Sequence, residues 1–295
     1  FNIQFPMKLL IVSRGSNYEC GRIIAAAAAQ GHVAHLLRFG ELRLGAGGEV
    51  DAVAWGARLV ANYDAVYFRR FYPYVSEALI LAELFARAGK RVIDEDLGRG
   101  HAIMSKTYEV QQLEVAGLLA PRTVQCFTVE DFLDAVQSFG YPVVLKGVHG
   151  GLGKYVFLVK TEARLCRLLA TKNRGFWSLQ QYLPTDSDIR VITIGHRAIG
   201  AMRRMIPEGD FRANVAVGGR GLKIPLAPDI KDLAERAARA MKREFAGVDI
   251  IVSRGKPYIL EVNQHPGFQA FEAATGIDVA GKFIDYLTKD FFSGS

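Results

Sequence analysis

The residues best suited to chemistry stand on two short apolar runs near the end of the chain, separated by the turn-like residues 253–257. The first run carries Asp249, and the second carries Glu261 and Asn263. Two runs of strand length around such a turn predict a β-hairpin. Side chains two positions apart share one face of a strand, so Glu261 and Asn263 point the same way and Asp249 could join them. Taken singly, each residue could face solvent, but together these oxygens favour a Mg²⁺ site completed by nucleotide phosphates and water.

Two lysines in the middle of the chain have settings that suit phosphate binding. Lys106 begins a predicted helix that has Ser105 as its N-cap, and Lys146 ends the predicted strand 141–146. The segment after Lys146 is rich in glycine, which lets a backbone fold closely over a ligand and offer it N–H groups. These glycines are Gly150, Gly151 and Gly153. The pattern is neither a Walker A loop nor a Rossmann fingerprint, so taken alone it favours an ordinary flexible turn.

The densest polar set of the chain lies on and after two predicted strands that meet at residues 195–196. Its members are Asp188, Arg190, Arg203, Arg204, Arg212 and Asn214. The planar fork of arginine suits carboxylate and phosphate groups. An enzyme that must neutralise a phosphate, a carboxylate and an oxyanion needs several such groups beside its metal. His196 and His265 have no partners at ligand spacing and are interpreted as structural.

Taken together, these motifs resemble the metal-binding end of the ATP-grasp ligases, and specifically the RimK-like α-L-glutamate ligase family. The resemblance extends over about residues 7–288 and includes residues 188–190, 202–204 and 209–214. It implies an ATP-grasp fold, with ATP and Mg²⁺ or Mn²⁺ as cofactors and two ions. It also implies a carboxylate–amine ligase that forms an amide bond and ADP through an acyl phosphate.

The resemblance assigns the nucleotide site. Lys106 and Lys146 match two lysines that reach the phosphates in ATP-grasp enzymes. Asp249, Glu261 and Asn263 match the metal ligands. The other residues expected to bind ATP are Gly150, Gly151, Gly153, Gln180, Gln181, Tyr182, Leu183 and Asp188. The family commonly has Glu where Gln181 stands, so nucleotide preference is open at this point.

The resemblance also implies the catalytic residues. Arg204 is expected at the transferring phosphate and Arg212 at the substrate carboxylate or acyl phosphate, with Arg203 and Asn214 beside them. The stretch from Arg203 and Arg204 to Gly209 is one residue longer than in close relatives. Which of the two arginines faces phosphate is therefore left open.

Substrate contacts are expected at the carboxyl ends of the first predicted strands, where parallel sheets bind ligands. The expected substrate-binding residues are Arg14, Asn17, Arg69, Arg190 and Arg212. For Arg14, Asn17 and Arg69, ordinary loop polarity is an equal alternative. The members of the family that carry Ser-Arg after the first strand favour substrate contact.

The first hundred residues alternate strands and helices, which predicts a mostly parallel sheet. The predicted strands are 8–13, 33–37 and 65–68, and the predicted helices are 19–30 and 77–88, with later helices at 229–245, 268–274 and 279–287. The expected fold class is α/β, an ATP-grasp fold with an N-terminal pre-ATP-grasp domain. The expected division is 1–97 for that domain, 98–184 for a central lobe and 185–295 for a C-terminal lobe. Residues 1–6, ahead of Met7, are interpreted as an added or unimportant extension.

The composition allows this interpretation. A chain of 295 residues with 50% hydrophobic residues can bury a substantial core in two or three lobes. No apolar run approaches the ~18 residues of a membrane span, and no secretory signal precedes the first strand. Cys20, Cys126 and Cys166 lie far apart and suggest neither a zinc site nor disulfides. The expected location is a reducing cytoplasm.

The net charge of +7 is dispersed along the chain and would attract ATP and acidic substrates. We expect an amino acid donor and an acidic acceptor, either a protein C-terminal tail or a small molecule, bound by a homo-oligomer, a dimer or tetramer. No membrane or nucleic-acid partner is expected. One alternative is a non-catalytic nucleotide-binding module of the same fold, against which the complete set of metal ligands and lysines argues. The other alternative is a nucleic-acid-binding protein, and the only evidence for it is the positive net charge.

Overall fold

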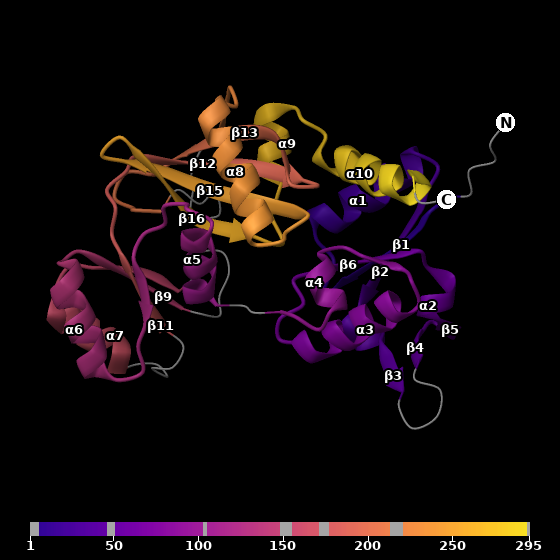
Figure 1. The fold of residues 1–295 in the computed structure, drawn as a ribbon, viewed down its shortest axis with the longest axis horizontal. Coiled ribbons are helices and arrows are strands. Elements are labelled where there is room, and N and C mark those ends of the chain that lie inside the picture. The colour runs from indigo at the N-terminus through magenta and orange to yellow at the C-terminus, as the bar shows by residue number, and fades with distance from the viewer. Residues whose placement is uncertain are drawn as a thin grey trace.

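The computed structural model describes residues 6–45, 51–102, 105–147, 155–170, 177–212 and 221–293 (Figure 1). The described residues form three lobes, each built around its own main sheet. The N-terminal lobe lies at one end of the molecule, and the other two lie together at the opposite end (Figure 1). Strand order and burial in each sheet determine which side chains point into the space between the lobes.

The N-terminal lobe contains a parallel sheet in the order β2-β1-β6-β7, as the alternating pattern predicted. Its strands are β1 (Lys8–Ser13), β2 (Val33–Arg38), β6 (Ala65–Arg69) and β7 (Arg91–Val92), and its helices are α1 (Tyr18–Ala29), α2 (Leu59–Asn62), α3 (Val75–Arg87) and α4 (Glu95–Gly98). A 3-10 helix η1 (Phe39–Glu41) and a small sheet of β3 (Arg43–Gly45), β4 (Asp51–Ala54) and β5 (Ala57–Arg58) complete it. Strand β1 is buried along both faces, because α1 packs on one side and α3 on the other.

The central lobe is an antiparallel sheet in the order β10-β9-β11-β8. Its elements are β8 (Thr123–Gln125), α6 (Val129–Phe139), β9 (Val143–Gly147), β10 (Val156–Val159), α7 (Glu162–Ala170) and β11 (Trp177–Gln181). Helices α6 and α7 bury one face against Leu145 and Leu179. Because side chains alternate along a strand, Lys146 and Gln180 point away from these helices.

The C-terminal lobe is a five-stranded antiparallel sheet in the order β14-β13-β12-β15-β16. Its elements are β12 (Ser187–Ile194), β13 (Arg197–Met205), β14 (Gly221–Ile224), α8 (Pro228–Ala240), β15 (Phe245–Ser253), β16 (Lys256–Asn263), α9 (Gln269–Thr275) and α10 (Val279–Ser293). The two predicted hairpins, β12 with β13 and β15 with β16, are confirmed. The prediction that the helix before β15 extends to Phe245 is wrong. The helix stops at Ala240 because Lys242 adopts a positive φ, and Phe245 already begins β15.

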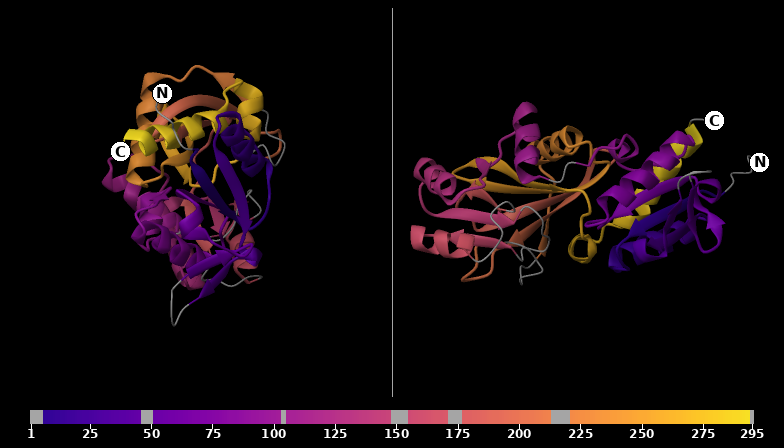
Figure 2. Two further views of the ribbon diagram at one scale, coloured as in Figure 1. Left: turned by 90° about the vertical axis from the view of Figure 1, so that its right-hand side faces the viewer. Right: turned by 90° about the horizontal axis from the view of Figure 1, so that it is seen from below.

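Helices from distant parts of the chain cover this last sheet. Helix α5 (Lys106–Val115) packs beside α8 on one face. Helix α9 and the start of α10 cover part of the other face, and α10 then lies along α1 of the N-terminal lobe (Figures 1 and 2). The chain therefore ends on the lobe where it began. The division at residues 97 and 184 stays a prediction.

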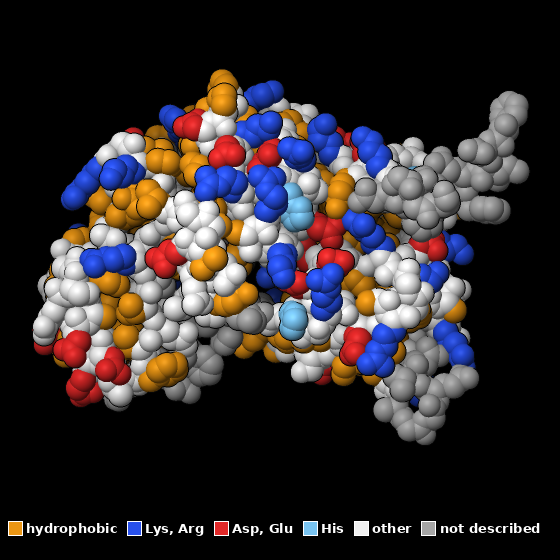
Figure 3. All heavy atoms as spheres, in the orientation of Figure 1, with side chains coloured by type: hydrophobic (Ala, Val, Ile, Leu, Met, Phe, Trp, Pro, Cys, Tyr) orange, Lys and Arg blue, Asp and Glu red, His pale blue; other side chains and the backbone are white. Residues whose placement is uncertain are grey.

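The surface shown in Figure 3 carries many Lys and Arg side chains over α8, with acidic side chains among them. Three ion pairs on this helix have i,i+4 spacing, for example Arg236 with Asp232 at 3.5 Å. The positive charge of this face is therefore interspersed with negative charge. Among the described residues, none of the helices combines the length and the apolar character that crossing a membrane would require.

Candidate active site

Six polar side chains from four strands share one face of the C-terminal sheet. The strand pairing places Asp249 opposite both Glu261 and Arg190, Asp188 opposite Arg204, and Asn263 opposite Gly247. Directly opposed residues in an antiparallel sheet point to the same face. The residues predicted as metal ligands and two of the predicted arginines are therefore brought together by the strand register. The end of this face that α9 and α10 leave uncovered is the candidate active site.

The carboxylate of Asp249 lies at the centre of this set and is held by two arginines. Arg190 donates to both of its oxygens through Nε and Nη2, the second at 2.7 Å, and Arg204 Nη2 lies 2.9 Å from Oδ2. Burial acts to raise the pKa of Asp249, but the two guanidinium groups outweigh it and lower the pKa to about 2. Asp249 is therefore an anion at any physiological pH.

Arg204 also joins Asp188, whose two oxygens it contacts at 2.6 Å each. Burial and the nearby charge of Asp249 raise the pKa of Asp188 in spite of this pairing. Arg203 is exposed on the opposite face of the sheet, because it is the next residue along the strand. Arg204 therefore joins the acidic set, and which of the two arginines faces the phosphate stays a prediction.

Glu261 is joined to the N-terminus of α5. Lys106 Nζ lies 2.6 Å from Glu261 Oε1 and 3.3 Å from Glu109 Oε2. Burial opposes the charge of Lys106, but the two carboxylates raise its pKa above the ordinary value. The lysine in turn lowers the pKa of Glu261, against burial and the charge of Asp249.

Glu109 is a site residue that sequence analysis did not single out. Its Oε1 accepts a hydrogen bond from the backbone N–H of Val262 at 2.5 Å, and so fixes α5 against the edge strand β16. Burial raises the pKa of Glu109 despite the charge of Lys106. A glutamate three residues after Lys106 on the predicted helix was the available signal, but only the fold shows that it is buried and what it contacts.

Lys146 lies on the other lobe, near enough to the same carboxylates for their charges to act on it. It lies on β9, on the face of the central sheet that points away from α6 and α7. Burial and then the charge of Lys106 lower the pKa of Lys146 to about 8, while Glu261, Glu109 and Asp249 act to raise it. The two predicted phosphate-binding lysines therefore converge on one place from two different lobes.

The oxygens of Glu261 and Asn263 fit a metal ion that arrives with a phosphate ligand, whereas both oxygens of Asp249 already accept hydrogen bonds from arginine side chains. Among the described residues, no three His, Cys, Asp or Glu side chains gather closely enough to hold an ion by themselves. Mg²⁺ bound with nucleotide phosphates needs only one or two carboxylates, with an amide oxygen and phosphates completing its shell. Asn263 Oδ1 accepts a hydrogen bond from His265 N at 2.9 Å, which fixes the orientation of the amide. In the present arrangement Lys106 Nζ is paired with Glu261 Oε1, the carboxylate predicted to bind the ion.

The residues predicted at the adenine end lie in and after β11. Gln180 is buried and its Nε2 donates to Thr123 Oγ1 at 2.9 Å, which ties β11 to β8. Gln181, at the end of β11, and Tyr182 and Leu183, in the connection to β12, are partly buried. Adenine binding by these residues stays a prediction. Gly150, Gly151, Gly153 and Asn214 lie outside the described residues.

Arg212 is paired with Asp210 in the described structure. Its Nε and Nη2 contact the carboxylate of Asp210 at 3.0 and 2.8 Å, and this pairing lowers the pKa of Asp210 to about 2. The two residues line a hollow with Phe157, Tyr182 and other residues at the edge of the central lobe. A role for Arg212 at the substrate stays a prediction.

The predicted substrate residues of the N-terminal lobe have different surroundings. Arg14 is exposed after β1. Asn17 is the N-cap of α1, where its Oδ1 accepts from Cys20 N at 2.9 Å. Arg69 is fully buried and donates to Pro266 O and Tyr67 Oη. The last two therefore have structural roles, and substrate contact by any of the three stays a prediction.

The family model of the RimK-like ATP-grasp domain matches residues 111–287. A ribosomal protein bS6–L-glutamate ligase of Escherichia coli O139:H28 is 29% identical over 290 residues, which is 96% of each chain.

Two solved structures resemble the fold. One is the ATP-grasp ligase PsnB complexed with a minimal precursor, Mg and ADP, with a TM-score of 0.71 and 23% identity over 95% of this chain and 96% of that one. The other is a RimK domain ATP-grasp protein of Sphaerobacter thermophilus, with a TM-score of 0.70 and 22% identity over 95% and 98%. These likenesses confirm the predicted fold class. The chain belongs to the RimK-like ATP-grasp family and is an ATP-grasp ligase, as its sequence predicted.

Proposed function

We propose that this protein joins a carboxylate to an amine at the expense of ATP and releases ADP. The observation that carries the proposal is the convergence of Lys106, Lys146, Asp249 and Glu261 from three separated segments. A ligase of this type needs cations for the phosphates and hard oxygens for the metal at the same place. The lysine cations and the carboxylate oxygens are both present here, on surfaces of two lobes that face each other.

The chain's own residues would act mainly by position and charge. Mg²⁺ with ATP supplies the phosphoryl group and neutralises part of its charge. Lys106 and Lys146 would attract the phosphates, and Glu261 and Asn263 would bind the metal ion through their side-chain oxygens. Arg190 and Arg204 keep Asp249 ionised, and their guanidinium groups hold both of its oxygens. Preorganised charges of this kind act without rearrangement at the moment of reaction, which is how such sites lower a barrier.

The substrates proposed are an amino acid such as glutamate and an acidic acceptor. The bS6–L-glutamate ligase is named for a reaction on a ribosomal protein, and PsnB is described with a precursor peptide. These names support a protein or peptide acceptor. The exposed guanidinium groups of Arg14 and Arg70, at the carboxyl ends of β1 and β6, would suit an acidic tail. Two metal ions, an acyl phosphate and a homo-oligomer remain parts of the proposal.

The experiment that tests this function is a screen for ADP release. Wild-type protein is incubated with Mg²⁺, ATP and pairs of one amino acid with one acidic peptide or small acid, and products are identified by mass. A product heavier than the acceptor by one amino acid residue, formed with equimolar ADP, supports the proposal. ATP binding without ADP release for any pair favours the alternative, a nucleotide-binding module without catalysis.

A further inference from the structure

The segment that follows the candidate metal ligands is held by the N-terminal lobe. Residues 264–268, here called the lobe-linking segment, connect β16 to α9. Three of its positions are bonded to side chains of the other lobe. Gln264 Nε2 donates to Asp94 at 2.7 Å, Pro266 O accepts from Arg69 Nη2 at 2.9 Å, and Phe268 N donates to Glu19 at 3.2 Å. The strand end with Glu261 and Asn263 is therefore anchored outside its own sheet.

Of the three side chains that hold this segment, Arg69 costs the most free energy to bury. Its side chain is 1% exposed, and within the described part of the chain it forms no ion pair with a carboxylate. It donates to Tyr67 Oη at 3.1 Å, lies over the rings of Tyr67 and Phe268, and leaves its buried Nε without a hydrogen-bond partner. A buried charge with so little compensation destabilises a fold. Its presence is explained if it serves the site rather than stability.

A short series of contacts connects Arg69 to Asn263, one of the proposed metal ligands. Arg69 fixes the carbonyl of Pro266, and the preceding residue, His265, packs edge-on against Phe71 with ring centroids 5.1 Å apart. The backbone N–H of His265 then donates to Asn263 Oδ1. An arginine that holds this turn in place therefore sets the orientation of the Asn263 amide.

We propose that Arg69 is a positioning residue for the metal site, and that the N-terminal lobe sets the geometry of Asn263 through it. The proposal rests on the function proposed above, in which Asn263 is a metal ligand. Residues that orient metal ligands without touching the ion commonly change metal affinity by 10–100-fold when replaced. Arg69 never contacts substrate in this account, so its effect should appear in metal binding.

The experiment measures the Kd of Mn²⁺ in the presence of saturating ADP by electron paramagnetic resonance, which needs no turnover. Arg69→Met should raise this Kd by about 10-fold or more. Arg69→Lys keeps the charge but loses the fork, and should give a smaller increase. Gln264→Met removes the bond to the buried Asp94 and leaves Arg69 in place, and should raise the Kd in the same direction. Thermal melting of each variant shows that it is folded under the conditions of the measurement.

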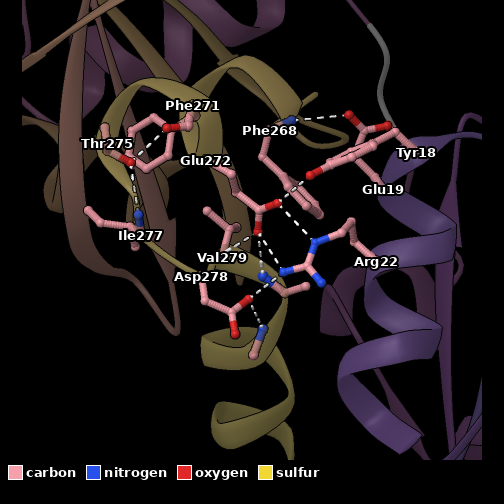
Figure 4. A network of polar contacts seen from close by, with 12 residues as sticks. Tyr18, Glu19, Arg22, Phe268, Phe271, Glu272, Thr275, Ile277, Asp278 and Val279 are labelled. Carbon is pink, nitrogen blue, oxygen red and sulfur yellow. Dashed lines mark hydrogen bonds and ion pairs between the residues drawn. The ribbon is translucent and has the colours of Figure 1, made fainter. Parts of the chain in front are cut away.

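A matched control exists in the same interface between lobes. Arg22 on α1 contacts Glu272 at 3.1 Å and Asp278 at 2.9 Å, as Figure 4 shows, but does not contact the lobe-linking segment. Arg22→Met should lower the melting temperature and leave the Mn²⁺ Kd within about twofold.

Folded Arg69 and Gln264 variants with the wild-type Kd would overturn the proposal. An Arg22→Met protein that loses as much Mn²⁺ affinity as Arg69→Met would also overturn it, because a general loosening of the interface between the lobes would then explain the effect. Wild-type protein that binds no Mn²⁺ with ADP would instead contradict the proposed function itself. The two failures are therefore distinguishable.

Discussion

Lys106 and Glu261 are separated by 155 positions in the sequence, and their side chains meet at 2.6 Å. In this pair Lys106 neutralises the Glu261 carboxylate, which is proposed to bind Mg²⁺. An ion can bind Glu261 only if Lys106 moves away or shares the carboxylate with the ion. A nucleotide phosphate offers Lys106 another anion, so nucleotide and metal should help each other to bind.

The first prediction is this mutual effect. The Kd of Mn²⁺ should fall by about 10-fold when ADP is present, a coupling of roughly 1.4 kcal/mol. Lys106→Met should reduce the difference, because Glu261 is then available without nucleotide. Electron paramagnetic resonance titration with and without ADP measures both. Equal Mn²⁺ affinities with and without ADP in the wild-type protein would contradict the exchange of partners.

The second prediction concerns the charge of Lys146. Its pKa of about 8 lies below the ordinary value of 10.5, so the folded state binds fewer protons than the unfolded state between these pH values. The free energy of unfolding should therefore rise with pH in that window. Lys146→Met should stabilise the nucleotide-free protein at pH 7 by about 1 kcal/mol or more, because a desolvated charge is removed. Chemical denaturation at pH 7 and 9 checks this.

The same lysine should make ATP binding depend on pH. Above pH 8 the free protein must take up a proton at Lys146 to face the phosphates, so affinity should fall as pH rises. Calorimetry in buffers of different ionisation enthalpy would detect the proton. Lys146→Arg, which stays charged, should bind ATP with little change between pH 7 and 9. An unchanged ATP affinity in Lys146→Ala would remove this residue from the site.

The third prediction compares two neighbouring arginines on opposite faces of β13. Arg204→Met should lower the free energy of unfolding by about 3–5 kcal/mol, because Asp188 and Asp249 are left buried with less positive charge. Arg203→Met, at an exposed position, should change it by no more than about 0.5 kcal/mol. Urea denaturation of both variants is the measurement. Similar losses in the two proteins would refute the assignment of Arg204 to the buried set.

The fourth prediction tests Arg212 as a residue of the reaction. If its guanidinium stabilises the acyl phosphate and the oxyanion, its contribution is greater in the transition state than in the ground state. Arg212→Lys should then lower kcat by about 100-fold or more, the scale of one lost oxyanion donor, with little effect on ATP affinity. Poor ATP binding with normal turnover at saturation would place Arg212 at the nucleotide instead. A variant without any defect would leave it as the partner of Asp210.

The grouping of Asp249, Glu261 and Asn263 on one face of a hairpin could be predicted from the sequence because it depends on short-range periodicity. Glu261 and Asn263 are two residues apart on one strand, and a recognisable turn brings Asp249 opposite Glu261. The same alternation separates Arg204 from Arg203, although the sequence alone did not show which face was buried. Local rules were sufficient wherever one strand or hairpin determined the geometry.

Other features depend on packing between distant segments and had no local signal. Glu109 acts through a bond to Val262, 153 positions away, and Arg69 acts through Pro266, 197 positions away. Arg69 was predicted to touch substrate because it follows a strand of a parallel sheet, and its burial became visible only with the fold. The end of α8 was misplaced for a related reason, since the positive φ of Lys242 belongs to the turn that starts β15.

The central claim is that Glu261 holds a metal ion for the nucleotide, and ADP binding at increasing Mg²⁺ concentrations tests it most directly. Calorimetry with the wild-type protein should show an ADP affinity that rises with Mg²⁺. In Glu261→Ala, with melting showing a folded protein, the affinity should no longer respond to Mg²⁺ and ligase turnover should be lost. A variant that keeps the wild-type dependence on Mg²⁺, or turns over almost normally at saturating Mg²⁺, would contradict the account.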